Sequence, residues 1–391
     1  MHLRAYKTEI EVNNVQNTLF LQHLGCARWA FNWALGKKKA AFEAKAKIPN
    51  AIELHRELNA LKKTEFPWFY QSSKSAPQNA LRDCDKAFAN FFTRCKKKAK
   101  GKKGFPKFKS KKNPKQSFRL DGAITIGDNW IKLPRIGKLK LKETGYFPAG
   151  KTPLSATISK HAGRWFVSIQ IEEELTPHPK TEAIIGVDLG IKTLATCSDG
   201  TTYQNPKALR KNLKKLKRKQ RQFSKTKKGS KNRERAKQRL ARLHNKIANS
   251  RKDCLHKITS ELVQKANVLV LEDLKIGNLL KNHCLAQSIS DVGMFEFRRQ
   301  IEYKAKWRGR VVFAPTFFPS SKLDHKSGLV NPDLKLSDRV IHHNDGTKTD
   351  RDLNAAINLR NYYHNSHTES SSGIYASGDG SSTSENWFSP S

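Results

Sequence analysis

The spacing of apolar residues changes several times along this chain of 391 residues and predicts a mixed α/β protein. Residues 3–12 alternate with a period of two, as in a β-strand. Apolar positions then recur every three or four residues over 17–46, 52–62 and 73–98, which predicts helices. Short strands follow at 124–126, 130–133, 138–141, 155–159 and 165–171. We expect the opening strand to complete a sheet or small barrel with them, across the helical segment.

The second half of the chain alternates between strand and helix patterns. Residues 176–180 read as a linker, and 206–257 as two helices broken at 224–230. A helix is predicted over 294–307, a strand over 309–315 and a helix from 350. From about residue 364 the sequence is rich in Ser and Gly, which predicts a disordered tail.

Three acidic residues stand at distinctive places in these elements. Asp188 interrupts the apolar run 184–196, which is expected to turn back as a hairpin at Asp199-Gly200. Glu272 ends a second apolar strand that begins at Val268. Asp352 lies in the first turn of the last helix, close to the sheet if the small Ala355 and Ala356 face it. This order of elements is that of an RNase-H-like fold.

A carboxylate inside an apolar element is costly unless it is paired or binds a metal. Three of them together suit hard divalent cations, which take oxygen ligands, and two such ions can clamp a phosphodiester. We therefore predict that Asp188, Glu272 and Asp352 hold a pair of such cations at a catalytic centre. The alternative is that each acid caps a helix or pairs with its own Lys or Arg, and for Asp352 or Asp350 a helix cap is the simple explanation.

The balance of charge points to a polyanionic partner. The chain has 75 Lys+Arg against 34 Asp+Glu, a net charge of +41, and such a surface binds nucleic acid with a strong salt dependence. Six cysteines without a CxxC pair and an N-terminus without an apolar signal core predict a reduced, cytoplasmic protein. No apolar run approaches the roughly 18–20 residues of a membrane span.

Two basic segments are candidates for nucleic-acid contact. The first, residues 94–115, has no acid and interleaves aromatic rings that could stack on bases with lysines that could follow phosphates, although such a run is often only a solvated face. Its predicted contacts are Lys96, Lys97, Lys98, Lys102, Lys103, Phe105, Lys107, Phe108 and Lys109. The second is the 207–257 helical region, with Lys214, Lys217, Arg218 and Arg221. A coiled-coil hairpin is the alternative, but its polar face would normally mix charges, so we expect it to lie along a duplex backbone.

Five motifs in order carry a family resemblance. They are Phe105-Pro106-Lys107-Phe108-Lys109, Gly186-Val187-Asp188-Leu189-Gly190, Leu271-Glu272-Asp273-Leu274, Phe318-Pro319-Ser320-Ser321-Lys322 and Asp350-Arg351-Asp352-Leu353-Asn354-Ala355-Ala356. With them the chain resembles the TnpB family of transposon-encoded RNA-guided DNA nucleases, relatives of the type V CRISPR effectors.

The resemblance implies a domain organisation. A β-barrel wedge domain would comprise 1–14 and 116–176, and a helical recognition domain 15–115. A RuvC-like nuclease domain would span 181–363, with the basic helical insertion 207–257 and a degenerate zinc-finger-like loop at 314–349. Residues 364–391 would be the disordered tail.

The resemblance also implies a function: Mg²⁺-dependent cleavage of double-stranded DNA next to a short flanking motif. A guide RNA from the protein's own element would read the target by base pairing. Membranes are not an expected partner.

The chain departs from the family at the zinc site. Members usually carry two CxxC pairs before the last aspartate, whereas the corresponding positions here are Asp324, Ser327, His342 and Asp345. His325 and His343 are nearby, but structural zinc sites favour cysteine, so we do not expect zinc. The loop 323–349 would then be held by other contacts or be mobile, which would loosen the nuclease centre.

Two other functions fit parts of the sequence. A cleavage-deficient RNA-guided DNA-binding repressor or transposition accessory protein would keep the basic surfaces and lose cutting. A DNA transposase also uses three carboxylates, but would bind transposon ends without RNA. Sequencing the nucleic acid that copurifies with the protein separates these hypotheses.

Overall fold

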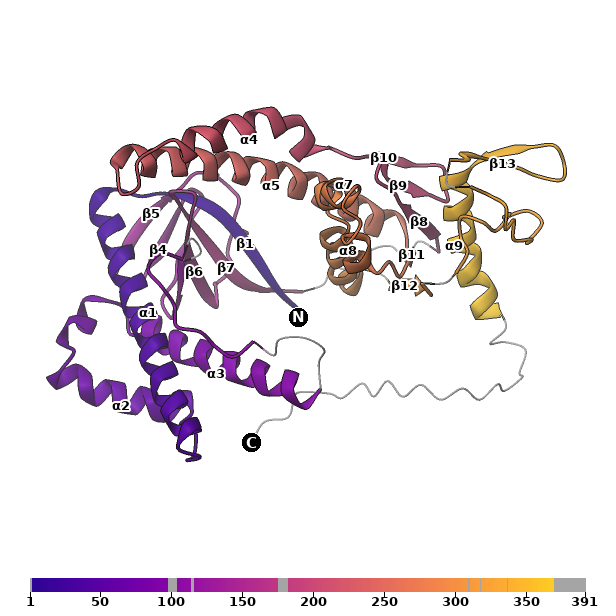
Figure 1. Cartoon of the computed structure of the whole chain (residues 1–391). Helices are drawn as coiled ribbons and strands as arrows, with labels where there is room; N and C mark the ends of the chain where they lie inside the picture. The colour runs from indigo at the N-terminus through magenta and orange to yellow at the C-terminus, as the bar shows by residue number, and fades with distance from the viewer. Residues whose placement is uncertain are drawn as a thin grey trace. The chain divides into compact units, whose positions relative to one another are not determined.

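The computed structural model describes residues 2–97, 104–113, 116–174, 182–308, 310–316, 318–335 and 337–368. The chain forms two compact units (Figure 1). Unit 1 contains Met1–Leu175 and Gln222–Arg242, and unit 2 contains Thr176–Arg221 and Leu243–Ser391.

The helices of unit 1 begin where the sequence supplies capping residues. Asn13 and Asn50 each accept a hydrogen bond from a backbone N–H of the first turn, within a capping box completed by Gln16 and Glu53. The helical elements are α1 (Asn14–Glu43), α2 (Ala51–Thr64), the short 3₁₀ helix η1 (Pro67–Gln71) and α3 (Ser75–Lys96). The three predicted helices are confirmed, with ends shifted by a few residues.

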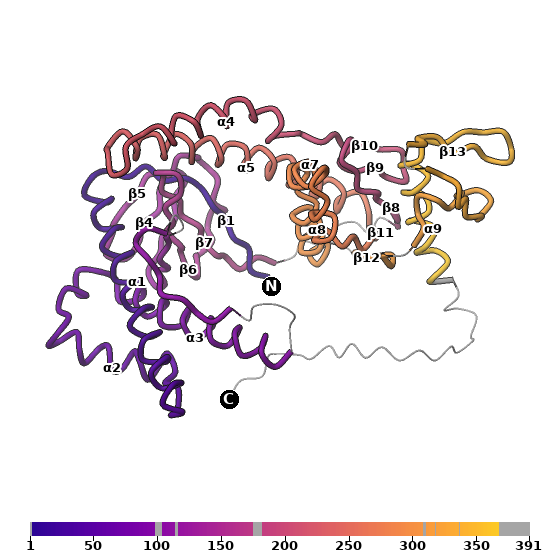
Figure 2. The backbone as a smooth tube through the Cα atoms, viewed as in Figure 1, coloured from indigo at the N-terminus to yellow at the C-terminus, as the bar shows by residue number. Residues whose placement is uncertain are grey.

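The opening strand lies inside the sheet of unit 1, as predicted. The strands are β1 (His2–Glu11), β2 (Gln116–Asp121), β3 (Thr125–Ile126), β4 (Trp130–Leu133), β5 (Gly137–Leu141), β6 (Ser155–His161) and β7 (Arg164–Glu173). Their order is β2-β6-β7-β1-β5-β4-β3, so β1 joins two groups of strands (Figure 2). All pairs are antiparallel. Among the described residues β2 and β3 are edge strands, so the expected barrel is seen here as a sheet with two edges.

Unit 2 has a mixed sheet of five strands in the order β10-β9-β8-β11-β12. They are β8 (Ile184–Leu189), β9 (Thr193–Cys197), β10 (Thr202–Gln204), β11 (Val268–Glu272) and β12 (Arg310–Ala314). The predicted hairpin is confirmed: β9 and β10 are antiparallel, and Gly200 provides the positive φ of 84° that the turn requires. The strands β8, β11 and β12 are parallel neighbours.

Helices cover both faces of this sheet. The helices that follow β10 along the chain are α4 (Ala208–Ser224), α5 (Lys231–Lys265), α6 (Ile276–Leu279), α7 (Ala286–Val292), α8 (Met294–Arg308) and α9 (Arg351–Thr368). Side chains of α5, α7 and α8 pack with Val187 and Leu271 on one face. Leu359 of α9 packs with Val268 and Val270 on the other face. The small hairpin of β13 (Val340–His342) and β14 (Lys348–Asp350) leads directly into α9.

The end of α9 corrects the predicted start of the tail. Residues 364–368 are helical rather than disordered. The hydroxyl of Ser366 donates to the carbonyl of Tyr362 one turn earlier, so serine is accommodated in the helix at this position. Residues 369–391 lie outside the described ranges. No helix in those ranges is both long and apolar enough to cross a membrane.

Candidate metal centre and nucleic-acid surfaces

The strands β8 and β11 place two of the predicted acids side by side. They are parallel neighbours in which Val187 pairs with Leu271. Asp188 and Glu272 are the next residues of their strands. Because side chains alternate between the two faces of a sheet, both carboxylates leave on the face that α9 covers, opposite to Val187 and Leu271.

Helix α9 approaches this face closely at Gly186. A Cβ atom at Gly186 would lie 2.0 Å from the carbonyl oxygen of Ala356 and 2.6 Å from the backbone nitrogen of Arg360. Only glycine therefore fits at Gly186. Ala355 and Ala356 are fully buried, which confirms that small residues let the helix lie against the sheet. Asp352 precedes Ala356 by one helical turn, so the same contact brings its carboxylate towards Asp188.

The electrostatics of Asp188 reflect this convergence. Burial and the neighbouring carboxylates of Asp352 and Glu272 raise the pKa of Asp188 to about 7. A hydrogen bond from the Leu189 backbone and the charge of Arg351 oppose this shift without cancelling it. Burial also raises the pKa of Glu272. The surroundings of Asp188 and Glu272 therefore disfavour the ionised form of each carboxyl group.

The neighbouring acids occupy the ordinary structural roles. Asp350 is the helix cap, since its Oδ1 accepts from the backbone nitrogens of Asp352 at 2.9 Å and Leu353 at 3.2 Å. Asp273 forms an ion pair with Arg298, whose guanidinium also stacks 4.1 Å from the ring centroid of Phe313.

The carboxylates of Asp188, Glu272 and Asp352 have few cationic partners. Within the described residues neither Asp188 nor Glu272 forms an ion pair, and the one made by Asp352, to Arg339, is 3.9 Å long. Among the described residues, the group of three potential ligands within 4.8 Å of one another is Asp324, His325 and His343, so the three carboxylates are spaced more widely than that. Their oxygens are nevertheless the type of ligand that hard divalent cations such as Mg²⁺ take.

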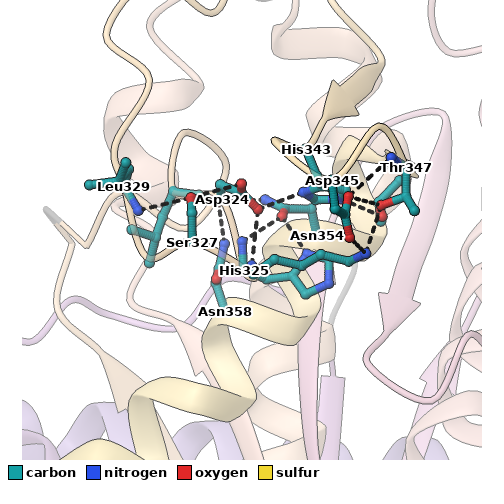
Figure 3. Close-up of polar contacts among 12 residues, drawn as sticks. Asp324, His325, Ser327, Leu329, His343, Asp345, Thr347, Asn354 and Asn358 are labelled. Carbon is teal, nitrogen blue, oxygen red and sulfur yellow. Dashed lines mark hydrogen bonds and ion pairs between the residues drawn. The ribbon is translucent and has the colours of Figure 1, made fainter.

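The expected zinc positions do not come together as a set. Asp324 lies with His325 and His343, whose ligand atoms are all within 4.8 Å of one another (Figure 3). His342 is exposed, because the alternation along β13 directs His343 inwards instead. Asp345 forms an ion pair of 2.6 Å with Lys326. The histidine that lies beside Asp324 is therefore His343 and not His342. Ser327 retains a contact, since its Oγ donates to Asp324 Oδ2 at 2.8 Å.

The first basic segment is only partly available to a ligand. Lys96, Lys97 and Lys107 are exposed, and the ring of Phe108 is 58% exposed. Lys98, Lys102 and Lys103 lie outside the described residues.

Phe105 and Lys109 are both engaged within unit 1. The ring centroid of Phe105 lies 5.5 Å from that of Phe88 and 5.1 Å from that of Phe91. Much of the Lys109 side chain remains exposed, but its ammonium lies 3.8 Å from the ring centroid of Phe31, and burial lowers its pKa. Phe105 thus contributes to packing within unit 1, whereas contact of the exposed Lys109 with nucleic acid stays a prediction.

The second basic segment forms the two predicted helices, and they pack together as a hairpin, which was the alternative to an extended contact with a duplex. Helix α4 contains eight Lys and Arg and no acid. Leu209 and Leu216 pack against Leu243 and Ile247 of α5 in a narrow apolar seam. The buried carboxylate of Asp291 accepts hydrogen bonds from the backbone nitrogens of Leu209 at 2.8 Å and Arg210 at 3.0 Å, and so fixes the start of α4. The four predicted contact residues are all exposed, namely Lys214, Lys217, Arg218 and Arg221.

Three family models match the chain. They are described as "Probable transposase" over residues 166–283, "Helix-turn-helix domain" over residues 1–47 and "Cas12f1-like, TNB domain" over residues 295–359. In this structure the segment matched by the second model is the strand β1 followed by the single long helix α1, so its name does not describe the local fold.

Bacterial relatives match most of the chain. A Streptomyces pristinaespiralis protein named "Putative RNA-guided DNA endonuclease" is 37% identical, and the match covers 91% of this chain and 88% of that protein. The protein named "Putative RNA-guided DNA endonuclease InsQ" from Escherichia coli K12 is 33% identical over 80% of each chain.

The fold matches a solved structure described as "Cryo-EM structure of the Cas12f1-sgRNA-target DNA complex". The TM-score is 0.57 at 14% identity, covering 88% of this chain and 82% of the other. The chain belongs to the TnpB family, the transposon-associated proteins whose members carry the name of RNA-guided DNA endonucleases.

Proposed function

We propose that this chain is an RNA-guided DNA endonuclease that cuts with divalent metal ions held by Asp188, Glu272 and Asp352. The observation that carries the proposal is that Asp188 and Glu272 leave the sheet on the face that α9 covers, where the charges of Asp352 and Glu272 help to raise the pKa of Asp188. The names of the bacterial relatives and the Cas12f1 complex with guide RNA and target DNA support the same assignment.

The role of each acid follows from its setting. Asp188 and Glu272 would hold the ions from the strands β8 and β11, and Asp352 would close the site from the first turn of α9. Mg²⁺ bound there would activate water and stabilise the leaving oxygen of a phosphodiester. Because Asp188 must be ionised to bind a cation, its raised pKa makes ion binding compete with a proton near neutral pH.

The basic surfaces would hold the nucleic acids. The exposed cations of α4 suit a phosphate backbone. Phe108, exposed beside Lys107, suits stacking on an unpaired base. We assign the sheet of unit 1 to the wedge domain and its helices to the recognition domain. The guide RNA would come from the protein's own element, and the protein would read a short flanking DNA motif.

The test uses the full chain purified with the RNA that copurifies from its own element. Sequencing this RNA gives the guide, and a plasmid carrying the matching target should be cut in Mg²⁺ but not in EDTA. Asp188→Ala should bind the same RNA and target without cutting.

Each rival function predicts a different result. Target binding by the wild-type protein without any cleavage in Mg²⁺ or Mn²⁺ would favour a repressor or accessory protein. Specific binding to transposon ends without RNA would favour a transposase.

A further inference from the structure

Three consecutive residues before β13, residues 324–326, each make a side-chain contact with a different segment, and Figure 3 shows those of Asp324 and His325. Asp324 Oδ1 lies 2.6 Å from His343 Nδ1, at the end of β13. His325 Nδ1 lies 2.9 Å from Asn354 Oδ1, in α9. Lys326 Nζ lies 2.6 Å from Asp345 Oδ2, in the turn between β13 and β14. The short turn therefore holds both the hairpin and the helix that follows it.

The contact between Asp324 and His343 has its polar atoms satisfied. His343 is 5% exposed, and its other ring nitrogen, Nε2, lies 2.7 Å from Thr349 Oγ1. Since a carboxylate can only accept, His343 Nδ1 carries the proton towards Asp324. Asp324 also accepts from the Lys326 backbone nitrogen at 3.0 Å and from Ser327 Oγ at 2.8 Å. Burial alone would raise its pKa, but these hydrogen bonds outweigh burial and lower the pKa of Asp324.

The contact with α9 ends two residues from Asp352. Asn354 is fully buried, and its Oδ1 accepts from His325 while its Nδ2 donates to the Leu323 carbonyl at 2.7 Å. One turn later, the buried Asn358 donates from Nδ2 to the carbonyls of Ser320 at 2.9 Å and Leu323 at 2.6 Å. A slide or rotation of the first turns of α9 would break these bonds, so they fix the register of the turn that carries Asp352.

We propose that Asp324, His343, His325 and Asn354 form a metal-independent polar clamp that positions Asp352 in the carboxylate centre. The inference rests on the proposed function of that centre. The clamp residues do not touch the reacting atoms and are positioning residues. The ligand atoms of Asp324, His325 and His343 are also close enough together to coordinate a transition metal ion. However, an ion there would have to displace the proton between His343 and Asp324 and reorganise bonds that are already satisfied.

The test compares two adjacent histidines of the same hairpin in the RNA-loaded full chain. His343→Leu removes both ring contacts, His343→Asn keeps a donor near the position of Nδ1, and His342→Leu changes the exposed neighbour. Mn²⁺ affinity is measured by electron paramagnetic resonance, with Asp188→Ala defining binding outside the carboxylate centre. Hydrogen exchange reports on the amides of residues 353–360, and elemental analysis reports on bound transition metals.

We expect His343→Leu to weaken Mn²⁺ binding about tenfold, the lower end of what outer contacts of metal ligands contribute. Exchange in the first turns of α9 should accelerate, and His343→Asn should recover most of both effects. His342→Leu should stay within about twofold of the wild type, as is usual for an exposed substitution. If His343→Leu does not fold, Thr349→Val, which removes only the hydroxyl beside Nε2, takes its place.

Two results would overturn the clamp. One is unchanged Mn²⁺ affinity and exchange in a folded His343→Leu. The other is a transition metal bound at one per wild-type chain and lost from His343→Leu, which would make the cluster a metal site. Failure of the proposed function looks different, because Asp188→Ala would then leave Mn²⁺ binding unchanged. In that case the clamp has no metal ligand to position. Faster hydrogen exchange of residues 353–360 in His343→Leu would then show only that its contacts stabilise the start of α9.

Discussion

The acidic residues of the two sheets have opposite surroundings. In unit 1, Glu9 lies 3.0 Å from Arg164 Nη1, Glu173 lies 3.2 Å from Arg4 Nη1, and Glu11 lies 3.1 Å from Lys140 Nζ. In the sheet of unit 2, Asp188 and Glu272 form no ion pair within the described residues, and Asp188 feels two other carboxylates instead.

The difference teaches how to separate structural acids from functional ones in a strongly basic protein. With 75 Lys+Arg for 34 Asp+Glu, a cationic side chain is the readily available partner for any acid. Acids kept away from such partners and close to one another are destabilising unless another cation binds them. Ion pairing within a sheet thus marks the structural acids, and mutual proximity marks the candidate metal ligands.

The largest difference in cleavage is expected between variants that each lack one acid, either a candidate metal ligand or an ion-paired acid. Asp188→Ala should reduce cleavage by about 10³-fold or more, because several kcal/mol of transition-state stabilisation by the ions is at stake. RNA and target binding should persist. Glu9→Ala, the matched control, removes two partly exposed ion pairs, to Arg164 and Lys142, each of which contributes at most about 1 kcal/mol. Its cleavage rate should remain near that of the wild type. Single-turnover cleavage assays measure both, and equal losses would remove Asp188 from the centre.

The comparison extends to cations that lack acidic partners. None of the ion pairs between described residues involves the α4 residues Lys214, Lys217, Arg218 and Arg221. Changing all four to Gln should reduce the slope of log affinity for duplex DNA against log salt by about 3.6, at about 0.9 for each of four lost phosphate contacts. Filter binding between low and physiological salt measures this slope.

A control with the same loss of charge changes four cations that do have acidic partners. These are Lys37, Lys47, Lys257 and Lys265. If this control lowers the slope as much as the α4 variant, the effect is one of net charge, and α4 is not a specific contact surface.

Gly186→Ala tests whether the close approach of α9 brings the acids together. The added methyl would meet the backbone of α9 at 2.0 Å. Overpacking of this kind typically costs about 1–3 kcal/mol, and more where backbone must move. We expect lower stability in chemical denaturation and weaker Mn²⁺ binding. Gly25→Ala in α1 meets nothing within 4 Å and should stabilise slightly through helix propensity.

The smallest expected effect concerns stability and pH in the metal-free protein. The pKa of Asp188 is raised from 3.8 to about 7, so its contribution to stability is fully present below pH 3.8 and is lost as the pH rises through about 7. Asp188→Asn stays neutral throughout. In EDTA at pH 8 its melting temperature should exceed that of the wild type by about 2 °C or more. The difference should vanish near pH 4, and a constant difference would contradict the raised pKa.

The sequence was informative where a residue contradicted its local pattern. A single acid in an apolar β-branched run is unusual, so Asp188 could be found without the fold, and Glu272 likewise at the end of its strand. Secondary structure alone then predicts that parallel neighbouring strands bring the two together. The period-two pattern of the opening residues likewise predicted that β1 joins this group of strands, but not that it lies in the middle of the sheet.

Tertiary contacts explain what the sequence did not reveal. Gly186 reads as an ordinary strand glycine, since the helix that requires it lies 170 positions later, at Ala356. Asn354 reads as a polar residue of a helix, and only the fold gives it His325. Phe105 was assigned to nucleic acid because it follows lysines, but its ring completes a cluster of helix aromatics. Whether His342 or His343 points into the protein depends on a shift of one residue in the register of a short strand.

The place of β1 has a consequence for synthesis of the chain. Its two neighbours, β5 and β7, end at Leu141 and Glu173. The strand β1 therefore cannot form its backbone hydrogen bonds on either side until those segments have left the ribosome. Meanwhile α1 to α3 can form, since their contacts are local. The nascent protein therefore exposes an unpaired N-terminal strand while more than a hundred residues are translated, and a chaperone or an early ligand for that strand would act in this interval.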